Sequence, residues 1–165
     1  LMELLVAMTV FLVVISIASS TFVQAMKTQR TIVKLSEGMN NLSLAIEQIA
    51  RDTRTGFSFP NGDSGPNGDT QLSFITARGE SVSYRLIDDD GDGAGSIGRC
   101  TESTCGADSD FSPITSENVG IERLSFFINN PVDYPPRITV VATVRANQDI
   151  DINLQATVSS RILDP

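Results

Sequence analysis

The chain has 165 residues, with 20 acidic residues against 12 basic ones and no histidine. This length supports one compact domain, or one domain with an appendage. The net charge of −8 argues against bulk nucleic-acid binding, because phosphates need a basic surface. The lack of histidine removes the commonest general base and zinc ligand, which excludes most histidine-dependent hydrolases and zinc sites.

The first predicted element is an apolar helix. Leu4 to Val23 form a run of 20 residues without a charge, and about 20 helical residues cross the hydrocarbon core of a bilayer. A cleaved signal peptide is the alternative, but it would show a basic region before the run and a small-residue cleavage site after it. Glu3 stands at the head of the run. A carboxylate there is costly unless it stays at the membrane interface or is neutralised by another molecule.

An amphipathic helix is predicted to continue the apolar run. Apolar residues recur at the spacing of one helical face, at Ile32, Leu35, Met39, Leu42, Ile46 and Ile49. Arg54 and Gly56 are typical of a helix end. We therefore expect a single helix of about 50 residues. The stripe is also typical of a coiled coil, but the strands that follow offer a sheet against which it can pack.

The remainder of the chain predicts an acidic head rich in strands. After a loop of turn residues at 60–69, apolar and polar residues alternate in five segments, which lie around Leu72 and Phe74, at 82–86, at 121–128 with an irregularity at Glu122-Arg123, at 138–144 and at 150–158. One apolar face per strand predicts an antiparallel sheet covered on one side, with the amphipathic helix as its cover. The expected fold class is α+β.

The predicted regions differ in charge. Residues 1–25 form the apolar half of the helix, 26–56 its amphipathic half, and 57–165 the head. Residues 1–56 carry five basic and four acidic residues, whereas 57–165 carry seven basic and sixteen acidic ones. The acidity of the chain therefore belongs to the head.

The N-terminal segment LMELLVAMTVFLVVISIASSTF resembles the N-terminal methylation segment of type IV pilins and pseudopilins. In that family the mature chain usually begins Phe-Thr-Leu-x-Glu, so Leu1-Met2-Glu3 match its third to fifth residues. Two residues and the leader peptide are then expected to precede this sequence. Three further features resemble minor pilins and J-type pseudopilins, namely Tyr84-Arg85-Leu86 before an acidic turn, Glu117-Asn118-Val119, and the late Ser159-Ser160-Arg161.

This resemblance implies a type IV pilin-like fold and a structural subunit that polymerises through its N-terminal helix for adhesion, motility or related surface functions. Partners would be further copies, other pilin-like subunits and the inner-membrane assembly machinery. The chain would reside in the bacterial inner membrane before assembly, and then in an extracellular pilus or periplasmic pseudopilus with its head outside the cytoplasm. Lys27, Arg30 and Lys34 would favour the opposite orientation by the positive-inside rule. The residues expected to carry assembly are Glu3, Leu4, Leu5 and Phe11.

An acidic turn provides a candidate metal site. Asp88, Asp90 and Asp92, followed by Gly93, match the first half of a calcium loop. The twelfth position is Arg99 and not the usual glutamate, which excludes a complete EF-hand, although Asp108 or Asp110 could complete the ligand set. The alternative is a solvated acidic turn. Calcium is the one cofactor that the sequence suggests, and none is required.

The two cysteines, Cys100 and Cys105, flank four residues. In an exported head they are expected to form a disulfide that closes a small loop. Free thiols or metal ligands are the alternatives.

No motif indicates an enzyme, since neither a glycine-rich phosphate loop nor a nucleophile elbow is present. The alternatives to a pilus subunit are therefore a J-type pseudopilin near the tip of a type II secretion pseudopilus, a minor tip adhesin or binding module, and a membrane-anchored enzyme.

Overall fold

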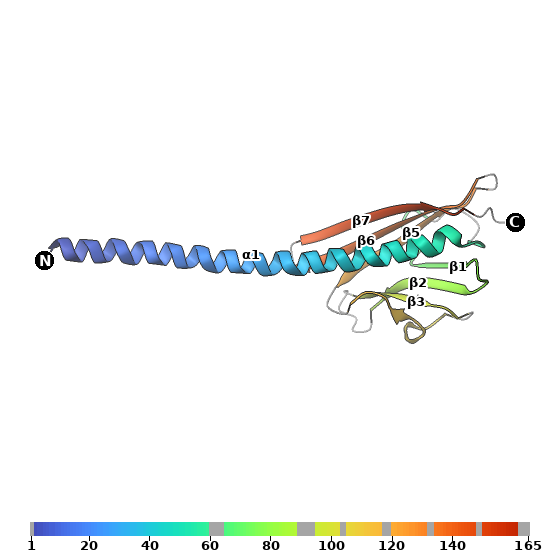
Figure 1. Ribbon diagram of the computed structural model, residues 1–165, viewed down its shortest axis with the longest axis horizontal. Helices are drawn as coiled ribbons and strands as arrows, with labels where there is room; N and C mark the ends of the chain where they lie inside the picture. Colours follow the sequence, from blue (N-terminus) through green and yellow to red (C-terminus); the bar gives the residue numbers. More distant parts are fainter. Residues whose placement is uncertain are drawn as a thin grey trace. The chain divides into compact units, whose positions relative to one another are not determined.

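The computed structural model describes residues 2–59, 65–88, 95–102, 105–116, 120–131, 134–147 and 150–161. The chain divides into two compact units, Leu1–Ser36 and Glu37–Pro165. The first unit consists of helix, and the second is an α+β domain (Figure 1). The predicted features at Glu117–Val119 lie outside the described residues.

One uninterrupted helix, α1 (Met2–Thr55), confirms the predicted single helix. It contains no proline and only one glycine, Gly38, so no residue in it strongly opposes helix formation. Its last turn holds Arg54, and the chain leaves the helix at Gly56. The predicted end of the helix is therefore correct.

The packed face of α1 differs in part from the predicted stripe. In the second unit its buried residues are Gly38, Leu42, Ala45, Ile46, Ile49 and Thr53. Met39 is 39% exposed and Ile32 is 57% exposed. At 3.6 residues per turn, these two side chains lie at or beyond the edge of the face that centres on Leu42 and Ile49.

In the part of the chain that the structure describes, seven antiparallel strands form two sheets, whereas the sequence predicted five strands in one sheet. The four-stranded sheet has the order β1-β2-β3-β4, with β1 at Gln71–Ile75, β2 at Ser81–Ile87, β3 at Ser96–Cys100 and β4 at Ser112–Pro113. The three-stranded sheet has the order β5-β6-β7, with β5 at Ile121–Asn129, β6 at Arg137–Asn147 and β7 at Ile150–Ser159. The five predicted strands are confirmed, and β3 and β4 are additional.

Two short backbone bridges join the sheets through β5. Asp69 and Phe126 exchange N–H···O bonds of 2.7 and 2.8 Å, and Gly95 and Ile121 exchange two of 2.9 Å. The register of β5 against β6 shifts between Ile121 and Arg123, which confirms the predicted irregularity at Glu122-Arg123. These bridges place the sheets beside each other without merging them.

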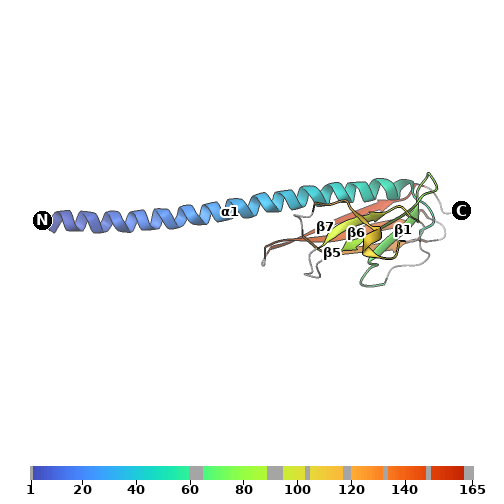
Figure 2. The ribbon, with the colours of Figure 1, turned by 90° about the horizontal axis from the view of Figure 1, so that it is seen from below.

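The second-unit part of α1 lies over one face of both sheets (Figures 1 and 2). Its buried residues share one hydrophobic core with strand residues that include Leu72, Tyr84, Phe126 and Val140. Burial of such side chains stabilises the head by about 1.5–3 kcal/mol for each large apolar residue. The predicted role of this helix half as the cover of the sheet is confirmed.

The opposite faces of the two sheets differ. A second cluster of Ile87, Cys100 and Phe111 covers the four-stranded sheet, with Cys105 packed against it. Because of this cover, Ser83 is buried although the sequence placed it on an open polar face. The expectation of a sheet covered on one side was wrong for this sheet.

Candidate functional site

The described residues of the chain give the apolar part of the first unit no cover. Every large apolar side chain from Met2 to Met26 is exposed, and Leu4, Leu5 and Phe11 are 67%, 59% and 63% exposed. Among the described residues, α1 is the one helix that is long and apolar enough to cross a membrane. A helix that is apolar on all sides is stable when lipid or other protein surrounds it. This segment is therefore compatible with membrane anchoring.

Two threonine side chains inside the apolar segment form hydrogen bonds with the helix itself. The Thr9 hydroxyl donates to the Val6 carbonyl oxygen at 2.8 Å, and the Thr21 hydroxyl donates to the Ile17 carbonyl oxygen at 2.9 Å. A hydroxyl that is bonded in this way avoids most of the cost of transfer into an apolar medium. The two threonines are therefore compatible with lipid or with a helical bundle.

Glu3 lies in the first turn of α1, and its side chain is exposed. The partial positive charge at a helix N-terminus stabilises a carboxylate there. Within the ranges that the structure describes, no side chain forms an ion pair with Glu3. A cation from outside the described chain is thus needed if this carboxylate is to be neutralised.

A polar network anchors the second-unit part of α1 to the four-stranded sheet. The Tyr84 hydroxyl donates to Oδ2 of Asp52 at 2.6 Å, and Nε of Arg99 donates to the Tyr84 hydroxyl at 3.1 Å. Nη2 of Arg99 lies 3.4 Å from the same Asp52 oxygen. Burial, reinforced by the neighbouring Asp52 carboxylate, raises the pKa of Tyr84 well above its ordinary value.

Sequence reasoning did not identify this network. Its members come from α1, β2 and β3, and no local spacing relates them. The one signal in the sequence was a tyrosine on the apolar side of a predicted strand, since a buried tyrosine hydroxyl usually has a partner.

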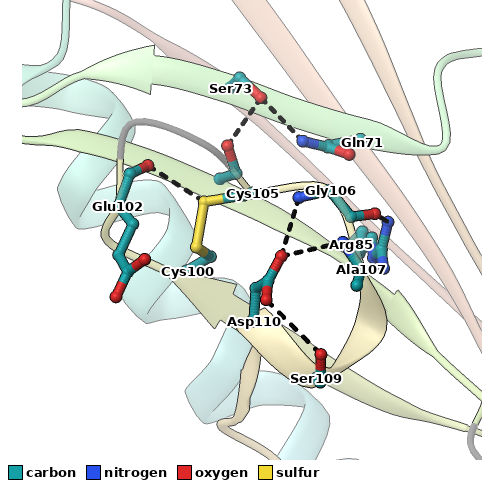
Figure 3. The surroundings of a disulfide bond; sticks show 11 residues. Gln71, Ser73, Arg85, Cys100, Glu102, Cys105, Gly106, Ala107, Ser109 and Asp110 are labelled. Carbon is teal, nitrogen blue, oxygen red and sulfur yellow. Dashed lines mark hydrogen bonds between the residues drawn. A yellow bond between two sulfur atoms is a disulfide. The ribbon is translucent and has the colours of Figure 1, made fainter.

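The cysteines form the predicted disulfide, Cys100–Cys105, with Cα atoms 6.1 Å apart (Figure 3). The bond joins the end of β3 to the segment that covers the four-stranded sheet. Free thiols are therefore excluded in this structure.

Arg85 holds the same covering segment. Its guanidinium forms an ion pair with Asp108, donates to the Gly106 carbonyl oxygen at 3.1 Å, and lies 4.3 Å from the centre of the Phe111 ring. A guanidinium over an aromatic face is favourable. The Cys100–Cys105 disulfide and the side chain of Arg85 thus both hold this segment on the sheet.

The two supplementary calcium ligands have protein partners. Asp108 pairs with Arg85, and Oδ2 of Asp110 accepts from the amides of Ala107 and Gly106 at 2.9 and 3.1 Å (Figure 3). Those two amides, that of Ala107 most, hold the pKa of the Asp110 carboxyl below its ordinary value.

The predicted calcium loop falls mostly outside the described residues. Asp90 and Asp92 lie outside the described residues, and Asp88 is the one predicted ligand of the loop that is described. Across the described ranges, no group of three or more acidic or cysteine side chains could hold a metal ion. Arg99, at the twelfth position, lies in β3 and interacts with Asp52 and Tyr84. The calcium site stays a prediction.

Comparisons with known proteins gave no match to any family model, curated protein or solved structure. The residues of this chain, and first of all its exposed apolar segment, are therefore what indicates its function.

Proposed function

We propose that this protein is a structural subunit of a type IV pilus or pilus-like filament and polymerises through residues 2–26 of α1. The observation that carries this proposal is the exposure of every large apolar side chain in that segment, on a helix that continues into an α+β head. Such a segment needs an apolar environment that the described part of its own chain does not supply. Lipid before assembly, and neighbouring helices after assembly, both provide one.

In the proposed assembly, the segment moves from the inner membrane into a bundle of identical helices. Lipid tails and apolar side chains are similar environments, so the transfer of the apolar residues costs little free energy. The acidic head stays outside the cytoplasm. It then lies on the surface of an extracellular pilus or of a periplasmic pseudopilus.

Glu3 sets the register in which neighbouring subunits pack in the filament. We propose that its carboxylate pairs with the N-terminal amine of an adjacent subunit in the filament. A carboxylate without a partner among packed helices is strongly unfavourable, so subunits in a wrong register are penalised. The exposed position of Glu3 in the first turn of α1 supports this role.

The substitution Glu3→Ala tests the pairing. We expect the variant to remain in the membrane fraction at the wild-type level but to be lost from sheared surface filaments, because anchoring needs only the apolar run. Glu37→Ala is the matched control, since Glu37 is also an exposed glutamate of α1, and it should assemble normally. Normal incorporation of the Glu3→Ala variant into filaments would contradict the pairing.

A further inference from the structure

A groove lies on the outer face of the three-stranded sheet, the face opposite to α1. Its volume is about 620 Å³. We call it the outer groove and define it by its principal lining residues, Phe127, Asn129, Tyr134, Arg137, Thr139 and Thr157. An adjoining depression of about 500 Å³ shares Phe127 and Thr139 and extends the surface to Arg123 and Gln155.

The strand register places these side chains in rows. Asn129 pairs with Arg137, and Phe127 pairs with Thr139, which pairs in turn with Thr157. They alternate along the strands with the buried Ile128, Ile138 and Val158. The outer groove is therefore built on a sheet whose inner face is fixed by the hydrophobic core, which is a rigid platform for a ligand.

Two aromatic rings border the outer groove. Tyr134 is 70% exposed, and it is the one large apolar side chain that the described strands and loops of the head expose. The amide of Tyr134 donates to the Pro131 carbonyl oxygen at 3.4 Å, and a proline follows it at Pro135. Because each proline restricts the backbone, the main chain that carries Tyr134 has less conformational freedom.

The ring of Phe127 lies close to the main chain at Gly68. A Cβ atom at Gly68 would lie 3.1 Å from Cζ of Phe127, and Gly68 has a φ of +73°. The left-handed backbone favours glycine at this position, and a Cβ atom would also crowd the Phe127 ring. One side of the Phe127 ring thus packs against the main chain, while the residue also lines the outer groove.

The charge on this face differs from that of the head as a whole. The described charged residues of the outer face are Arg123, Arg137, Arg145, Glu122 and Asp151. Both acidic residues form ion pairs with Arg145. Arg123 and Arg137 form no ion pair with any acidic residue that the structure describes, although the head carries sixteen acidic residues.

We propose that the outer groove binds an acidic carbohydrate, that is, an oligosaccharide containing uronic acid units. The apolar C–H faces of the sugar rings contact Tyr134 and Phe127, and the hydroxyls bond to Asn129, Thr139 and Thr157. The carboxylate pairs with Arg137, whose planar donors match a carboxylate in a bidentate manner. This binding function goes beyond filament assembly and does not depend on it.

Two other classes of ligand fit the surface less well. Proline-rich peptides bind aromatic grooves, but they give no role to the arginines. Nucleic acids need several cations along the phosphate backbone, whereas the described residues of the outer face include two arginines without an ion pair to a described acidic residue, on a strongly acidic head. Neutral hydroxyl-bonding side chains beside aromatic rings and a cation favour a carbohydrate with carboxylates.

Calorimetric titration of the full chain in detergent micelles tests this inference. The probe is a galacturonate tetrasaccharide at 0.15 M salt, where screening limits the long-range effect of the acidic head. We expect saturable binding that Tyr134→Ala and Arg137→Gln each weaken at least tenfold, while Tyr134→Phe stays within about threefold of the wild type. Arg78→Gln is the matched control, because Arg78 is an exposed arginine in the β1–β2 turn, and it should bind within about twofold of the wild type.

Several results would overturn the proposal. They are the absence of saturable binding, equal affinity for a neutral galactose tetrasaccharide, and an equal loss of affinity in Arg78→Gln. Tighter binding of a proline-rich peptide or of single-stranded DNA at the same residues would also overturn it. Should Tyr134→Ala lower the thermal unfolding temperature of the head, Arg137→Gln and Tyr134→Phe decide the question.

Discussion

The two parts of helix α1 use similar residues in opposite environments. Leu12 in the first unit is 63% exposed, whereas Leu42 in the second is fully buried. The first part is apolar on all sides and its large apolar side chains are exposed among the described residues, while the second has one apolar face that packs on two sheets. One continuous helix can therefore be stable in two environments when its apolar residues change from an all-round distribution to a stripe along one face.

The largest expected effect comes from truncating a phenylalanine in each region. Phe126 is fully buried and Phe11 is 63% exposed. We expect Phe126→Ala to lower the free energy of unfolding of the head by about 3–5 kcal/mol, because it leaves a cavity in the core. Phe11→Ala should change it by less than about 0.5 kcal/mol. Denaturant unfolding in detergent, followed by the near-ultraviolet signal of the two tyrosines, measures both, and equal losses would contradict the division of the helix.

Removal of the disulfide should give a smaller effect that is confined to the head. The double variant Cys100→Ser, Cys105→Ser opens a loop whose ends are five positions apart in the sequence. Loop-closure entropy predicts that the free energy of unfolding falls by about 2 kcal/mol. The fraction of protein in the membrane should not change, because the apolar segment contains no cysteine. The reduced wild-type protein is the control. A change in membrane retention, or a reduced wild type as stable as the oxidised one, would contradict this prediction.

The smallest expected effect concerns the polar network between α1 and the four-stranded sheet. Tyr84→Phe removes both the hydrogen bond to Asp52 and the one from Nε of Arg99, and should cost the head about 1.5 kcal/mol at neutral pH. The variant leaves the contact between Arg99 and Asp52 in place. An unchanged unfolding free energy would show that this network does not help to hold the helix on the sheet.

The same network makes the free energy of unfolding of the head depend on pH in the alkaline range. The pKa of Tyr84 is raised from its ordinary value of 10.0, first by burial and then by Asp52, so the folded state retains a proton that the unfolded state loses. This stabilisation is complete below about pH 10 and is lost as the pH rises above that value. We expect a steeper alkaline loss of stability in the wild type than in Tyr84→Phe. In a Tyr134→Phe background, Tyr84 is the only tyrosine, so tyrosinate absorbance reports its ionisation alone.

Much of the fold follows from periodicity in the sequence. The uncharged run, the stripe through Leu42 and Ile49, and the end at Gly56 predict α1 correctly. Alternation predicts β1, β2, β5, β6 and β7, and even the irregularity at Glu122-Arg123 is visible. Where local pattern and burial agree, the sequence was sufficient.

The parts that were not predicted depend on tertiary contacts. Strand β3 contains Gly98 and Arg99, a poor strand signal, yet a Cβ at Gly98 would overlap the side chain of Ile87 and approach Cβ of Phe111 to 2.8 Å. The glycine is thus needed by the layer that covers this sheet, and that layer could not be foreseen. The network of Asp52, Tyr84 and Arg99, and the outer groove, likewise join residues that are distant in sequence.

The most direct test of polymerisation through α1 is photo-cross-linking from position 11 in sheared surface filaments. A photoreactive phenylalanine analogue replaces Phe11, and a second variant carries it at Arg78 in the exposed β1–β2 turn as a control. The proposed function predicts cross-links from position 11 to residues 2–26 of neighbouring pilin-like subunits, including further copies of this chain, and none to that segment from position 78. Cross-links from position 11 to lipid alone, with no subunit pairs in the filament fraction, would contradict it.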